Sequence, residues 1–140
     1  MATVHETYDF DVPVERLYAH LSVHENLKPL LGVDVKRIQE GTTEPNGVGS
    51  VRKLSARGLM PFEETVTEAI PNERIEYRVT KGTPLRNHLG VMVFSSTGAG
   101  GSHLDYTITF DAAVPGLAGV VAAGLKRSLR RGFPKIARQL

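Results

Sequence analysis

Four polar residues in this sequence fall at positions where the surrounding pattern favours apolar side chains. Each shares a two-residue period with apolar neighbours, so in a strand it would face the same side as they do. The four are Glu6, Arg52, Glu64 and His88. A buried carboxylate is stable only beside a cation, so we expect Arg52 and Glu64 to pair across adjacent strands. Such a cluster is either a structural ion pair or the polar end of a binding pocket. A register slipped by one residue would instead turn all of these side chains to water.

The chain's four tyrosines also fall on the predicted inner faces. They are Tyr8, Tyr18, Tyr77 and Tyr106. A phenol can donate a hydrogen bond to a ligand carbonyl while its ring lines the wall of a pocket, and it can equally fill a core. If the site catalyses a reaction, His88 or Glu64 would move a proton while Arg52 or a tyrosine polarises a carbonyl.

Other motifs of catalysis or cofactor binding are weak. His20 and His24 have the i, i+4 spacing of a metal site, but Ser22 between them suggests a helix break, and no glutamate follows His20 as a zinc-protease motif requires. The glycines at 98–101 precede a strand rather than a helix, so they form a turn and not a phosphate cradle. The sequence has no cysteine, which excludes disulfides and thiolate chemistry. We expect no metal and no cofactor.

The segments that would position the polar residues are mainly strands. Turn-forming sequences such as Glu44-Pro45-Asn46-Gly47 separate them at intervals of about a dozen residues, which predicts antiparallel hairpins. The predicted strands are residues 3–11, 33–40, 48–56, 62–70, 74–81, 87–95 and 103–112.

Helical patterns occur in two places. Two short helices are predicted after the first strand, one beginning at Pro13 and one over 24–31. A long helix is predicted over 115–140, with a kink near Pro134. Small residues dominate the first half of its inner stripe, which would leave room for a ligand. The stripe consists of Ala118, Val121, Ala122, Leu125, Leu129, Gly132, Ile136 and Leu140.

This order of elements predicts an α+β fold in a single domain over residues 1–140: a seven-stranded antiparallel sheet wrapped around the long C-terminal helix. The formal charge of +2 is uneven, because residues 115–140 hold six positive charges and no negative one. Such a face is usually solvated, although it could bind a partner protein. We expect no nucleic-acid role, because no aromatic residues are interleaved with the cations. No signal peptide or membrane span is evident, so we expect a cytoplasmic protein, either monomeric or weakly dimeric.

Several local motifs add a resemblance to this order of elements. They are VPVERLYAHLSVHENL (12–27), GVGSVRKL (47–54), EETVTEAIPNERIEY (63–77) and GAGGSHLDYTITF (98–110). Together they resemble the helix-grip superfamily, which includes START lipid-transfer domains and the birch-pollen allergen family. Within it, the chain is most similar to the polyketide cyclase/dehydrase-like proteins.

The resemblance implies a cavity between the sheet and the long helix that holds a small hydrophobic molecule. We expect the site to be lined by Tyr8, Tyr18, Leu30, Arg52, Glu64, Tyr77, His88, Met92, Phe94, Tyr106, Ile108, Val121 and Leu125. Three functions remain open at this stage. The favoured one is binding or transport of an aromatic or lipid-like molecule; the others are a cyclase, aromatase or dehydrase reaction and a protein interaction through the basic helix.

Overall fold

The computed structural model describes all 140 residues. Seven strands, a 3₁₀ turn and three α-helices follow one another along the chain. In order they are β1 (Ala2–Phe10), α1 (Val14–Leu21), η1 (His24–Leu27), α2 (Lys28–Leu31), β2 (Asp34–Gln39), β3 (Val51–Ala56), β4 (Leu59–Ile70), β5 (Arg74–Lys81), β6 (Leu85–Ser96), β7 (Ser102–Ala112) and α3 (Leu117–Gln139).

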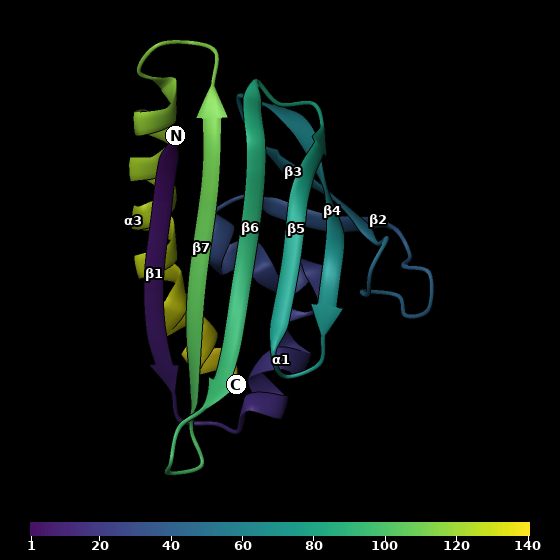
Figure 1. The fold of residues 1–140 in the computed structure, drawn as a ribbon, viewed down its shortest axis with the longest axis vertical. Coiled ribbons are helices and arrows are strands. Elements are labelled where there is room, and N and C mark those ends of the chain that lie inside the picture. The colour runs from purple at the N-terminus through teal and green to yellow at the C-terminus, as the bar shows by residue number, and fades with distance from the viewer.

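All seven strands form one antiparallel sheet in the order β1-β7-β6-β5-β4-β3-β2. Every neighbouring pair except β1 and β7 is joined by a direct connection, as the short turn sequences predicted. The α-helices gather on one side of this curved sheet, and α3 runs along the strands at the β1 and β7 edge (Figure 1). The predicted α+β helix-grip architecture is therefore confirmed.

The element boundaries differ from the sequence predictions in a few places. The single helix predicted over 24–31 is a 3₁₀ turn followed by the one-turn helix α2, which ends at Gly32 in the left-handed region with a φ of 72°. Strands β4 and β6 begin at Leu59 and Leu85, earlier than the predicted 62 and 87. Helix α3 continues through Pro134 to Gln139.

The two-residue alternation of buried and exposed positions is clear in β7. In β7 the even-numbered residues from Ser102 to Phe110 are buried and the intervening ones are partly exposed. One face of the sheet therefore carries the core, and the other meets water.

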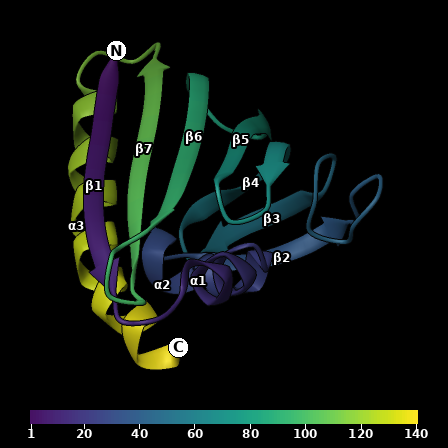
Figure 2. The ribbon, with the colours of Figure 1, turned by 60° about the horizontal axis from the view of Figure 1, so that its bottom comes forward.

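Helix α3 packs closely only along its second half. Leu129, Phe133 and Ile136 are buried there. Gly132 lies against α2 so closely that a Cβ built on it would be 2.2 Å from the Pro29 carbonyl oxygen. Helices α1 and α2 lie beside this C-terminal end of α3 (Figure 2). None of the helices combines the length and apolarity that a membrane span requires.

Candidate functional site

The expected ion pair forms between β3 and β4. Arg52 of β3 lies directly opposite Glu64 of β4. The Arg52 Nε donates to Glu64 Oε1 over 2.7 Å. The two residues are only 2% and 4% exposed. The register prediction is therefore correct at this position, and both charges are buried on the inner face.

Of the two terminal nitrogens of Arg52, one has a hydrogen-bond partner and the other has none. Its Nη1 donates to the Nδ1 of His24 over 3.2 Å, and its Cζ lies 4.2 Å from the centre of the Tyr77 ring. Its Nη2 is buried and has no hydrogen-bond partner. Burial alone would lower the pKa of Arg52, but the nearby Glu64 carboxylate raises it above the usual value, so the guanidinium stays charged. A buried charged donor without an acceptor is costly. Nη2 is therefore an unused hydrogen-bond donor that an acceptor from outside the protein could satisfy.

His24 is fixed as a neutral imidazole by its two partners. Since Arg52 can only donate, His24 accepts at Nδ1, and its Nε2 then carries the proton and donates to Ser50 Oγ over 2.8 Å. Burial, reinforced by the Arg52 charge, lowers the pKa of His24 to about 4. His20 bonds instead to Gln139, so the two histidines at helical spacing do not converge.

His88 is held on the other side of Glu64. The Val79 backbone N–H donates to its Nδ1 over 3.1 Å, so in the neutral ring Nε2 carries the proton, and this atom lies 3.8 Å from Glu64 Oε2. Burial lowers the pKa of His88. A β-bulge positions this ring, because Asn87, with a φ of 52°, and His88 together face the single residue Phe110 of β7.

Two tyrosines complete the cluster. The hydroxyls of Tyr77 and Tyr106 hydrogen-bond to each other, and both side chains are fully buried. Burial raises the pKa of each phenol, so both are neutral. The hydroxyl that accepts this bond keeps its own hydrogen for another acceptor. Gly90 makes the arrangement possible, since a Cβ there would be 2.1 Å from Cζ of Tyr77.

We call these residues the inner polar cluster: His24, Ser50, Arg52, Glu64, Tyr77, His88 and Tyr106. Its members come from the η1 turn, the segment before β3, and strands β3 to β7. Sequence analysis missed two of them, although signals existed. Ser50 has the two-residue period of Arg52, and His24 precedes the buried Leu27 by three residues.

Other residues expected at the site lie outside this cluster. Tyr8 stacks on Phe133, with ring centres 5.3 Å apart, and Tyr18 contacts Phe94 edge-on. Glu6 pairs with Arg130 of α3. The side chains of Leu30, Met92, Phe94 and Ile108 are part of the apolar core.

The space expected for a ligand is filled at its centre. Tyr77, Met92 and Tyr106 are 0% exposed, so not even a water-sized sphere touches them. The first half of α3 differs, since Val121, Ala122 and Leu125 are only partly buried. The described hollows lie elsewhere: one against the β6–β7 turn and one between α2 and α3. The open cavity predicted around these core residues is thus closed in this structure, while the apolar side chains along the first half of α3 are only half-buried.

The architecture and the buried cluster together define a helix-grip protein with a polar centre in its core. The sequence matches the family described as "Polyketide cyclase / dehydrase and lipid transport" over residues 1–140, so the chain belongs to this family. Among proteins with curated descriptions, no sequence matches the chain significantly.

Solved structures with the same fold come from several bacteria. A Thermobifida fusca protein is 16% identical, with a TM-score of 0.76, over 99% of this chain and 93% of its own. The protein XoxI of Bacillus cereus is 14% identical, with a TM-score of 0.75, over 99% and 95%. A Thermus thermophilus protein is 20% identical, with a TM-score of 0.73, over 99% and 95%. At these identities the likeness concerns the fold alone.

Proposed function

We propose that this protein binds a small, mostly apolar molecule carrying a carbonyl or carboxylate oxygen. The observation that carries the proposal is the buried Arg52 Nη2, which has no acceptor within the protein. The Tyr77–Tyr106 pair supplies a second unused donor. One ligand oxygen that accepts from both would relieve the cost of leaving charged and neutral donors unpaired in the core.

The apolar part of the ligand would lie against the first half of α3. Ala118, Val121, Ala122 and Leu125 face the core there without being fully buried. In the second half of the helix, by contrast, Leu129, Phe133 and Ile136 are buried. The first half of α3 therefore has less packing to lose than the second half when the helix and the sheet separate to admit a ligand.

A cyclase or dehydrase reaction receives less support from the same geometry. Such a mechanism needs a general base with a free lone pair near the substrate. His24 and His88 each use Nδ1 to accept a bond from the protein and carry the proton at Nε2. The acceptor left is Glu64 Oε2, which faces the His88 Nε2 at 3.8 Å, while Oε1 of the same carboxylate is paired with Arg52. The cluster is arranged to donate hydrogen bonds, which favours binding over proton abstraction.

The first experiment identifies the ligand class directly. Native mass spectrometry of freshly purified protein should show a retained molecule whose accurate mass includes at least one oxygen. The complementary assay titrates the protein with an uncharged naphthyl ketone dye, whose fluorescence reports an apolar environment and whose carbonyl is its single strong acceptor.

Matched variants test the donor role. We expect Tyr106→Phe to weaken dye binding about tenfold, the effect of losing one buried hydrogen bond of about 1.4 kcal/mol. Tyr8→Phe removes a hydroxyl outside the cluster and should leave the affinity unchanged. His88→Ala against His103→Ala gives a second pair, because His103 lies on the outer face beside Asp9. Equal losses within either pair would contradict the assignment.

A third pair tests the apolar wall. Ala122→Phe should abolish dye binding while the fold is retained, whereas Ala123→Phe, at an exposed position of the same helix, should not. Unchanged affinity in Ala122→Phe would overturn the placement of the ligand beside α3.

A further inference from the structure

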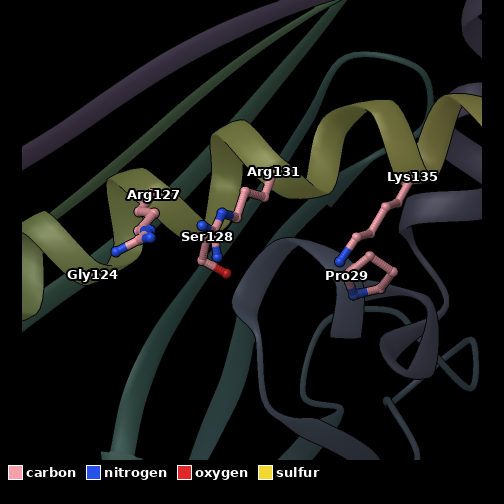
Figure 3. Close-up of a pocket in the computed structure, with 6 residues that line it drawn as sticks. All are labelled: Pro29, Gly124, Arg127, Ser128, Arg131 and Lys135. Carbon is pink, nitrogen blue, oxygen red and sulfur yellow. The ribbon is translucent and has the colours of Figure 1, made fainter.

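A second hollow of different chemistry lies between α2 and α3. Its volume is about 210 Å³, and no hydrophobic residue lines it. We call it the α2–α3 groove. Its lining residues are Pro29, Gly124, Arg127, Ser128, Arg131 and Lys135 (Figure 3).

The three cations of the groove occupy successive turns of one helix face. Arg127, Arg131 and Lys135 are spaced i, i+4 and i+8. The Cβ atoms of neighbouring members are therefore about 5–6 Å apart, and their like charges repel each other. Figure 3 shows the Arg131 guanidinium beside Ser128, and the Lys135 side chain extending toward Pro29. Positive charge is thus concentrated along one side of α3.

No protein carboxylate neutralises this charge. Arg127, Arg131 and Lys135 form no salt bridge, whereas Arg130, on a different face of α3, pairs with Glu6. Across the groove, the neighbouring Lys28 is itself a cation and is already paired with Asp34. Helix α3 contains no acidic residue. No carboxylate of the protein therefore offsets the repulsion between these three cations.

The walls of the groove are held firmly. Ser128 Oγ donates to the Leu30 carbonyl over 2.6 Å, and Gly132 packs directly on the Pro29 backbone. Further along the helix, Gly124 leaves open space, with no other atom within 4 Å of a Cβ built there. The backbone that carries the cations is thus preorganised by tight packing on one side, while the groove stays open on the other.

We propose that the α2–α3 groove binds a phosphate group. Two guanidiniums on adjacent turns can each offer paired N–H donors to a tetrahedral anion, and the ammonium of Lys135 adds a third charge. A single carboxylate would be satisfied by one arginine and would leave the other charges unrelieved. Nucleic acid fits poorly, because no aromatic side chain lines the groove for base stacking.

Two sources could supply this phosphate, a small soluble phosphoester or the headgroup of an anionic phospholipid. The experiment separates them. ¹⁵N-labelled protein is titrated with inorganic phosphate and with glycerol 3-phosphate at constant ionic strength, and the amide shifts of Gly124 and Ser128 are followed by NMR. In parallel, the protein is mixed with phosphatidylglycerol vesicles and with phosphatidylcholine vesicles, and co-sedimentation is measured.

The expected result is a saturable shift at Gly124 and Ser128 in at least one soluble titration, weakened at least tenfold in Arg127→Gln/Arg131→Gln. The matched control is Lys126→Gln/Arg138→Gln, which removes two positive charges from exposed positions of α3 outside the groove and should change the affinity less than twofold. Co-sedimentation only with phosphatidylglycerol, lost in the groove variant and kept in the control, would assign the site to lipid headgroups.

Equal weakening in both double variants would mean that only the net charge matters and would overturn the proposal. So would the absence of any saturable shift together with the absence of groove-dependent vesicle binding. The test is independent of the function proposed above, because the uncharged ketone dye should bind Arg127→Gln/Arg131→Gln with unchanged affinity.

Discussion

The inner face of the sheet has two regions that are built differently. Around β1 and β7 the core is apolar and close-packed, with Phe10, Leu104 and Phe110 all buried between the sheet and α3. Around β3 to β6 the same face carries the buried charges of Arg52 and Glu64. The two regions therefore belong to one sheet but differ in whether their buried side chains are apolar or charged.

The apolar region needs no partner beyond the chain. Its side chains gain free energy simply by leaving water, so small changes in shape are its main vulnerability. The polar region gains little from its charges, since the cost of burying them offsets most of their attraction. A fold that needed only stability would place apolar residues there. The difference fits the binding function proposed above, in which the apolar region holds the structure and the polar region would meet the ligand.

The largest expected effect comes from breaking the ion pair. Arg52→Met would leave the Glu64 carboxylate buried without its cation and should lower the free energy of unfolding by about 3–5 kcal/mol. Chemical denaturation measures this. The double variant Arg52→Met/Glu64→Leu, which removes both charges, should be clearly more stable than the single one. If the double variant is as unstable as Arg52→Met, the pair is structural support, and the contrast between the two regions is wrong.

The apolar region is tested through two glycines of the same helix. Gly132→Ala places a Cβ against the Pro29 carbonyl and should destabilise the protein by about 2–3 kcal/mol through overpacking. Gly124→Ala meets open space and should stabilise it by about 0.5–1 kcal/mol, because alanine favours the helix. Thermal unfolding compares the two variants, and equal destabilisation by both would mean that the contact with Pro29 is not what makes Gly132 sensitive.

Much of the architecture could be predicted from the sequence. Two-residue alternation and turn residues indicated all seven strands, because these signals are local. The inward register of Arg52, Glu64 and His88 followed from the same alternation. A β-bulge is harder to foresee, and the one at Asn87 determines how the His88 ring is presented.

The state of the interior could not be predicted from the same patterns. The alanines and glycines of α3 suggested an open cavity near Tyr77 and Tyr106, but whether space stays empty depends on rotamers of residues far apart in sequence. The two phenols bond to each other and Arg52 lies over the Tyr77 ring, so the volume is filled. His24 was missed for a similar reason, since its partner Arg52 is on a distant strand.

The last effect we predict is a pH dependence of stability that arises in the polar region. His24 has its pKa lowered from 6.5 to about 4 by burial and by Arg52, so between these values the unfolded chain binds more protons than the folded one. Stability should therefore be complete above pH 6.5 and decline as the pH falls, by about 2 kcal/mol between pH 8 and pH 5 from this group. Protonation would place an N–H at Nδ1 opposite the Arg52 donor, which is the physical reason for the loss. His24→Gln should reduce the slope of the profile measured by urea denaturation and leave the part that comes from His88, whose pKa burial also lowers, while His103→Gln, on the outer face, should retain the slope. A slope that survives His24→Gln unchanged would show that the imidazole is already doubly protonated in the folded protein. The donor arrangement inferred for the inner polar cluster would then be wrong.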